Sequence, residues 1–339
     1  MQERIGDVVF RQLARRLQGR RGKARAFGAE LPAPDLIATA TELLAFELPW
    51  DGAGAGDTRR IYAAASSASA GWRGAALYSV QSANLVPIGG SGARRCVLGA
   101  ATSALPASSA MLFDRASELE IVLVSSDFGL TEASLAALAA GANRALLGDE
   151  VVQFAAAVET APATWRLRGL LRGRGGTEAA ARRGHMAGTP FVLLDDGPVL
   201  VDPEAEATHL AAIGLADAGP VIAEIANPGL TMRPLTPVHP RMRAMPGGGI
   251  ALQWTRRARG AWSWSDGVDA PLNEQREAYL VGLGDTGTPA LRWEVDQPRL
   301  ELSAATLAGL SQAHGGKALW VRQIGAQAVS APLLLTTLA

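Results

Sequence analysis

The chain has 339 residues, of which 48% are hydrophobic and 19% are charged. By the usual domain size of ~150 residues this length suggests about two domains, and the apolar fraction is ample for buried cores. The 32 basic residues balance 32 acidic residues, which excludes a surface built throughout for nucleic acid or an anionic membrane. Cys96 is the only cysteine, so an internal disulfide or a thiolate metal cage is excluded.

Residues 1–59 are predicted to form a basic N-terminal arm and a linker. Apolar residues recur every four positions at Val9, Leu13 and Leu17, as on one face of a helix. Such a helix could be an amphipathic helix exposed to solvent, or a segment that contacts a partner. Residues 36–50 fit a pair of strands or a short helix. The start of the chain lacks the apolar region of a secretory signal, and we expect no membrane span and a protein made in the cytoplasm.

Residues 60–235 are predicted to form an irregular β-rich domain. Short apolar or alternating runs at 75–80, 120–125, 150–159 and 165–173 are bounded by turn residues, which is typical of strands. The last two runs are separated by five residues and predict a hairpin. A second hairpin is predicted over residues 191–202, and the stretch 131–146 predicts a helix with Thr131 as a candidate N-cap.

Residues 236–339 are predicted to form a β-sandwich. A proline-rich segment precedes them, and about seven short alternating runs then follow within ~100 residues, which is typical of a two-sheet sandwich. Two of these strands flank the turn at 247–249. Trp254 is the expected core aromatic between the two sheets. The predicted fold class is therefore mainly β and multi-domain, with a β-rich domain followed by the sandwich.

The motifs of common enzyme sites are incomplete in this sequence. Gly22-Lys23 and Gly316-Lys317 lack the first glycine and the hydroxyl residue of a phosphate-binding loop, and 89–93 ends in alanine where a nucleophile elbow needs glycine. The four histidines lack metal-ligand spacing. Adjacent acidic pairs such as Asp149-Glu150 are expected to be turn residues. We therefore expect no catalytic residue, no metal and no cofactor.

One stretch has the composition of a contact surface. Tryptophan and arginine are the residue types most enriched at binding hot spots. Several of them follow the second sandwich strand within one long loop. The alternative is that this loop folds back and that both of its indoles cover the end of the sandwich. The candidate partner-binding residues are Arg256, Arg257, Arg259, Trp262 and Trp264. The arginines along 166–174 are instead expected to pair with nearby carboxylates.

Several motifs, in order along the chain, resemble a known family. They include RALLGDEVVQF (144–154), WRLRGLLRGRGGTEAAARRGHMAGTPFVLLDD (165–196) and PLTPVHPRMRAMPGGGIALQWTRRARG (234–260), together with AALYSV (75–80), 103–117 and 264–281. Over roughly residues 60–339 they are similar to the C-terminal region of the large baseplate protein of gene transfer agents and siphophage tails. Residues 1–59 match poorly, and we expect neither the TIM-barrel-like domain nor the hub domains that lie upstream in that family to be part of these 339 residues.

The resemblance implies a structural component of a phage tail or gene transfer agent baseplate, located in the virion tail and assembled in the host cytoplasm. It implies a C-terminal sandwich like fibronectin type III and a role in fibre attachment or host-surface contact. The partners it implies are other tail proteins such as the hub and a fibre, further copies of the chain, and a host-surface glycan or receptor. The alternative is a carbohydrate-binding or cell-surface accessory module with a fibronectin-like domain.

Overall fold

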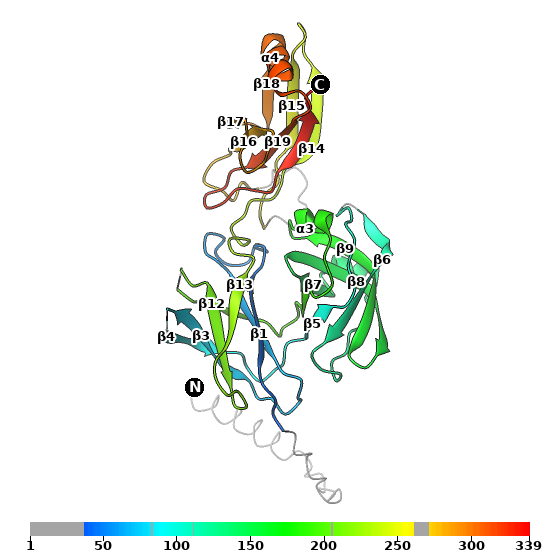
Figure 1. Ribbon diagram of the computed structural model, residues 1–339, viewed down its shortest axis with the longest axis vertical. Coiled ribbons are helices and arrows are strands. Elements are labelled where there is room, and N and C mark those ends of the chain that lie inside the picture. Colours follow the sequence, from blue (N-terminus) through cyan, green and yellow to red (C-terminus); the bar gives the residue numbers. More distant parts are fainter. Residues whose placement is uncertain (1–36, 83, 111, 205, 261–270) are drawn as a thin grey trace, which may run out of the picture. The chain divides into compact units, whose positions relative to one another are not determined.

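The computed structural model describes residues 37–339 except 83, 111, 205 and 261–270 (Figure 1). The described residues are mainly β and form an open sheet, a closed barrel and the two sheets of a sandwich, which confirms the predicted fold class. The basic arm expected over residues 1–30 lies outside the described residues. None of the helices in the described part of the chain is both long and apolar enough to cross a membrane.

The first body is a seven-stranded sheet that mixes strands from distant parts of the sequence. Its strand order is β11-β2-β1-β13-β12-β3-β4, and β1 pairs with β13 in parallel while the other pairs are antiparallel. The strands are β1 (Glu42–Glu47), β2 (Ile61–Ser66), β3 (Ala75–Gln81), β4 (Asn84–Gly90), β11 (Val199–Val201), β12 (His209–Gly214) and β13 (Val221–Ala226). β1 thus lies within a sheet, although residues 1–59 were expected to be an arm and a linker.

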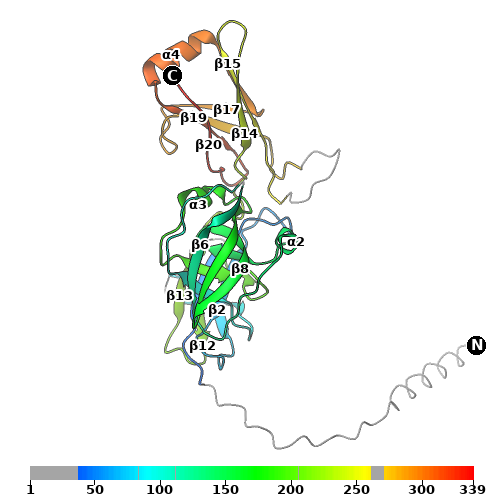
Figure 2. The same cartoon turned by 90° about the vertical axis from the view of Figure 1, so that its right-hand side faces the viewer.

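The second body is a closed barrel with the strand order β10-β5-β6-β9-β8-β7. Two short helices accompany it, α2 (Leu135–Ala139) between β6 and β7 and α3 (Glu178–Arg183) after β9 (Figure 2). The strands are β5 (Leu98–Ala101), β6 (Phe113–Leu123), β7 (Arg144–Leu147), β8 (Glu150–Ala161), β9 (Thr164–Arg174) and β10 (Pro190–Leu193). Closure leaves no sheet edge open in this body.

The barrel strands contribute apolar side chains to two separate cores, one on each face. Successive side chains of a strand point to opposite faces, so Val152 and Phe154 fill the barrel interior while Val151 faces outward. The outward residues pack against β1 and β2 in a shared cluster with Phe46 and Ala64. The other face of β1 and β2 belongs to the separate core of the seven-stranded sheet. The open sheet and the barrel are therefore joined by an apolar core of their own.

The C-terminal residues form two facing sheets of three and four strands, β14-β15-β18 and β17-β16-β19-β20, as expected for a fibronectin type III-like sandwich. Trp254 is buried, and its ring meets the Tyr279 ring of the opposite sheet edge-on at 5.3 Å. The elements are β14 (Val238–Ala244), β15 (Ile250–Thr255), β16 (Tyr279–Leu283), β17 (Leu291–Val295), β18 (Arg299–Leu302), α4 (Ala304–His314), β19 (Ala318–Gln323) and β20 (Leu333–Thr337).

The predicted hairpin over 191–202 is wrong. β10 and β11 flank the turn at 195–197, but β10 joins the barrel and β11 joins the seven-stranded sheet. The turn chemistry is present, because Asp195 Oδ1 accepts a hydrogen bond from the Gly197 backbone N–H at 2.9 Å. The two strands nevertheless find other partners, since their apolar faces belong to different cores.

The helices also differ from the sequence prediction. The helix expected over 131–146 is reduced to α2, whose N-cap is Ser134 rather than Thr131, and the chain then continues as β7. The turn at 175–177 leads into α3, and the loop after β18 contains α4; neither helix was predicted. The hairpin of β8 and β9 is confirmed, with a loop shortened to Pro162 and Ala163.

The sandwich core depends on Trp254, so we predict that Trp254→Ala lowers the free energy of unfolding by about 3–5 kcal/mol, the usual cost of truncating a buried aromatic side chain. Urea unfolding followed by far-UV circular dichroism measures this change. Met242→Ala is the control on the neighbouring strand, because Met242 is 56% exposed, and it is expected to change the stability by less than about 0.5 kcal/mol. Equal effects of the two substitutions would contradict this account of the core.

Candidate functional site

Arg259, one of the expected contact residues, is buried and serves contacts within the chain. Its Nε donates to Glu274 Oε1 at 2.7 Å, and its Nη1 donates to the carbonyl oxygens of Gly56 at 2.8 Å and Thr231 at 3.1 Å. The guanidinium also lies over the Trp50 ring, 5.6 Å from the ring centroid. Arg259 thus ties the loop after β15 to the loop between β1 and β2 and to the segment after β13.

The other expected residues are placed as follows. Arg257 Nη1 donates to Glu178 Oε1 of α3 at 2.8 Å, and Arg256 Nη1 donates to the carbonyl oxygen of Pro271 at 3.4 Å. Trp262 and Trp264 lie outside the described residues. Arg257 and Arg259 thus contact α3 and segments next to the open sheet rather than the sandwich. Whether the two indoles cover the sandwich end lies outside the described residues, and binding of a partner by these five residues stays a prediction.

The barrel contains a buried cluster centred on Glu150 at the start of β8. Arg172 of β9 holds this carboxylate with two parallel hydrogen bonds, Nε to Oε1 at 2.7 Å and Nη2 to Oε2 at 2.9 Å. Gly173 N–H donates to Oε1 at 2.7 Å and His185 Nε2 to Oε2 at 2.8 Å. The side chains of Arg172 and Glu150 are both 0% exposed. Glu150 is thus a buried strand residue, and its expected place in a turn is wrong.

The cluster fixes the charge on Glu150. Burial alone raises the pKa of this carboxyl, but the hydrogen bonds from His185, Arg172 and Gly173 and the Arg172 charge outweigh burial and hold the pKa below its usual range. Both carboxylate oxygens already accept hydrogen bonds from inside the chain. The carboxylate is also closed to solvent, so this arrangement is suited to holding three segments of the barrel together rather than to proton transfer with a substrate.

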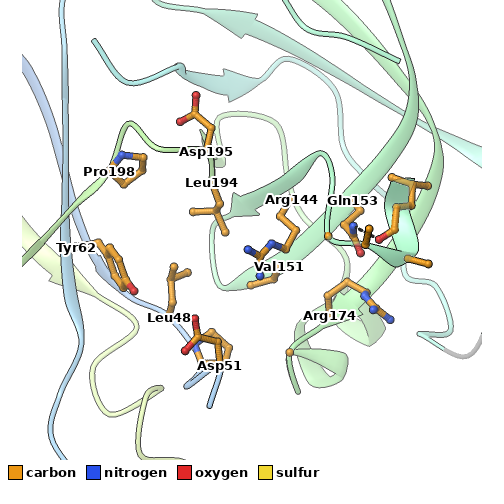
Figure 3. A pocket seen from close by; sticks show the side chains of 16 residues that line it. Leu48, Asp51, Tyr62, Arg144, Val151, Gln153, Arg174, Leu194, Asp195 and Pro198 are labelled. Atoms are coloured by element: carbon orange, nitrogen blue, oxygen red, sulfur yellow. Dashed lines mark hydrogen bonds between the residues drawn. The ribbon is translucent and has the colours of Figure 1, made fainter. Parts of the chain in front are cut away.

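A cavity of about 560 Å³ lies between the outer face of the barrel and the end of β1 and start of β2 of the open sheet. Figure 3 shows Tyr62, Leu48 and Leu194 around the open space, with the Arg144 guanidinium facing it from the barrel side. Its charged lining residues are Asp51, Arg144, Arg174 and Asp195. Sequence reasoning did not single out this cavity, because its two walls come from segments far apart in the sequence.

The sequence nevertheless contained one indication of which residues line the barrel side of this cavity. The run 144–154 forms a tight hairpin in which Arg144 pairs opposite Gln153. Strand periodicity then puts Val151 and Gln153 on one face of β8. Gln153 is buried on that face, where its Nε2 donates to the carbonyl oxygens of Leu138 at 2.8 Å and Ala142 at 2.7 Å. Among the residues described here, no group of three or more histidine, cysteine, aspartate and glutamate side chains is arranged to hold a metal ion.

Residues 96–192 match a family model described as Rcc01698-like, C-terminal. The matched range takes in the barrel from β5 to within β10, and it includes Glu150, Arg172 and His185. No curated protein matches the chain.

Solved structures similar to the chain include domains A168–A170 of titin, at 11% identity over 70% of this chain and 96% of that chain with a TM-score of 0.21. They also include the FN1–FN3 domains of chicken CNTN1, at 10% identity over 87% of this chain and 95% of that chain with a TM-score of 0.20. These scores are too low to support an argument about function, and the sandwich is identified from its own strand order.

We predict that Arg172→Met lowers the free energy of unfolding by about 3–5 kcal/mol, because it leaves the Glu150 carboxylate buried without its main partner. Arg168→Met is the matched control on the same strand. Arg168 pairs with Glu118 at 2.6 Å, but both side chains are about half exposed, so the control is expected to cost at most about 1 kcal/mol. Chemical denaturation of the full chain measures both values, and a loss below 1 kcal/mol for Arg172→Met would refute a structural role for the cluster.

The pH dependence follows from the lowered pKa of Glu150. Its folded state binds fewer protons than the unfolded state near the unfolded value of about 4.3, so its stabilising contribution is complete above that pH and is lost as the pH falls through the lower folded value. We expect the stability of the native chain to decrease more steeply than that of Glu150→Gln in this acidic window. Thermal melts at successive pH values measure the two slopes, and parallel slopes would contradict the prediction.

Proposed function

We propose that this chain is a structural subunit of the tail tip, or baseplate, of a phage or gene transfer agent. The observation that carries the proposal is the family match, which spans the barrel rather than one short motif. The name of the matched family is from a gene transfer agent-associated protein. The order of motifs from 144 to 281, which resembles the baseplate protein, supports the same assignment.

The motif residues within the barrel have identifiable structural tasks. Arg172 grips Glu150, and Gly173 beside it has a positive φ of 61°. A Cβ at Gly173 would lie 2.8 Å from the Cα of Glu178, so a side chain here would collide with the start of α3. Thr177 Oγ1 accepts a hydrogen bond from the Val151 N–H at 3.0 Å. The residues of this motif thus stabilise the barrel from within, and a rigid barrel is what a subunit of a large assembly requires.

In this proposal the chain acts through shape and contact, without a catalytic step. It resides in the virion tail, where it contacts further copies of itself and other tail proteins such as the hub and a fibre, and where it takes part in fibre attachment or host contact. Stable contacts of this kind bury on the order of 1,600 Å² or more. Sheets that are joined by apolar cores are rigid. Their surfaces therefore bind a neighbouring subunit without the entropy cost of ordering flexible segments.

The proposal predicts that the chain co-purifies with the tailed particles. An epitope-tagged copy, expressed in a cell that produces the tailed particles, should co-sediment with them at a fixed small number of copies per particle. Deletion of the gene should yield particles whose tails lack the tip or fail to attach to cells, because the tip would lack one of its contact surfaces. Quantitative mass spectrometry of purified particles, together with cryo-EM of the tails, measures both outcomes.

Two controls keep this test decisive. The wild-type chain supplied from a plasmid should restore attachment, and Arg168→Met should restore it equally well because that variant is expected to fold. A chain that remains in the unassembled protein fraction while particles keep an intact tip would contradict the assignment.

A further inference from the structure

Two arginines and two aspartates line the cavity of Figure 3, and the aspartates are already paired with other arginines. Asp195 Oδ2 is engaged by Arg94 at 2.5 Å, and Asp51 lies 3.9 Å from Arg60. Neither Arg94 nor Arg60 lines the cavity. The two acids are therefore paired with cations outside the space, and Arg144 and Arg174 are the remaining charges of the lining.

The side chains of Arg144 and Arg174 have no hydrogen bond or ion pair to any other residue in the described part of the chain. Strand register places them on one face. Arg144 of β7 pairs opposite Gln153, and Arg174 of β9 pairs opposite Val151, two residues earlier on β8. The strands β7 and β9 flank β8, so the two backbones stand about 9–10 Å apart. Both are exposed. In Figure 3 the Arg144 guanidinium points into the space and that of Arg174 points away from it, so Arg174 reaches a group held over β8 by a change of rotamer.

The wall of the cavity that faces the two arginines is largely apolar and includes an aromatic ring. Tyr62 lines the cavity, and its ring is backed by Phe46, which stacks on it with the centroids 6.1 Å apart and the planes at 15°. Leu48, Leu194 and Pro198 add further apolar surface around the space. The volume of about 560 Å³ falls within the range of small-molecule sites, about 300–1,000 Å³. The cavity therefore combines a supported aromatic face with two guanidinium groups that lack partners.

From this arrangement we propose that the cavity binds a sugar ring that carries a negative group, either a carboxylate or a phosphate. The anionic group contacts Arg144 and Arg174, whose planar donors match such oxygens. The apolar face of the ring lies on Tyr62, and the carboxylate oxygens of Asp51 and Asp195 accept hydrogen bonds from ring hydroxyls. The inference rests on the proposed function for the source of the sugar, which is the host surface.

The test is binding of defined sugars to the full chain, measured by calorimetry at low salt. Glucuronate and digalacturonate present a carboxylate, glucose 6-phosphate presents a phosphate, and cellobiose is the neutral control. Binding of at least one charged sugar and none of cellobiose is expected, and the affinity should decrease as salt rises. Comparison of the carboxylate and phosphate arms identifies which anionic group is preferred.

Substitutions locate the site. Arg144→Gln and Arg174→Gln are each expected to weaken binding about tenfold or more, the loss expected for one charge-assisted hydrogen bond. Tyr62→Ala should weaken binding of every charged sugar. Arg241→Gln is the control, because Arg241 is an exposed arginine on β14 outside the cavity, and it should leave binding unchanged. Thermal melts should show that the arginine variants are as stable as the native chain, since the side chains of Arg144 and Arg174 have no internal partners to lose.

Three results would overturn the inference: no binding of any charged sugar, equal binding by Arg144→Gln and the native chain, or selective binding of an acidic peptide such as hexaglutamate. Particles that carry Arg144→Gln separate this inference from the proposed function. If both hold, these particles assemble normally and adsorb less well to cells. If the chain binds charged sugars through the cavity but is absent from particles, the tail assignment fails and the binding site stands.

Discussion

The buried ion pair between Glu150 and Arg172 is the interaction on which the barrel depends. It links the first residue of β8 to β9, and through His185 it reaches the segment that leads from α3 to β10. Taking both charges out of water is costly, and a buried pair of this kind is sustained by complete hydrogen bonding rather than by charge attraction alone. Here the carboxylate is completed by Gly173 N–H and the guanidinium by the Pro106 carbonyl oxygen at 3.0 Å.

This cluster explains why the matched family region is a structural unit. Residues 96–192 contain both members of the pair, the glycine turn that follows them and the strands that they hold. The barrel interior is apolar, and the polar cluster stands where β9 passes into α3. Both carboxylate oxygens of Glu150 accept hydrogen bonds from within the chain, so the charged groups of this cluster serve the fold itself.

The cavity arises from a different constraint, the shared core between the barrel and the open sheet. That core brings Val151 and Leu146 of the barrel against Phe46 and Ala64 of the sheet. Beyond the edge of this contact the two bodies diverge, and the side chains that line the gap, Arg144 and Tyr62 among them, come from both walls. A site of this kind is held by packing on two sides, so its shape does not depend on a single loop.

The sequence by itself determined the mainly β class, the hairpin of β8 and β9 and the burial of Trp254, because alternation and turn residues are local signals. Of the arginines expected to pair with carboxylates, Arg166, Arg168 and Arg172 do so, whereas the prediction is wrong for Arg174. It could not determine that β10 and β11 separate into different sheets, that Asp149-Glu150 includes a buried charge, or that Arg259 faces the chain's own carbonyl groups. Those features depend on which apolar faces meet across long separations in the sequence. The tertiary structure alone decided them, and with them the cavity, since its walls are brought together by a core shared between distant strands.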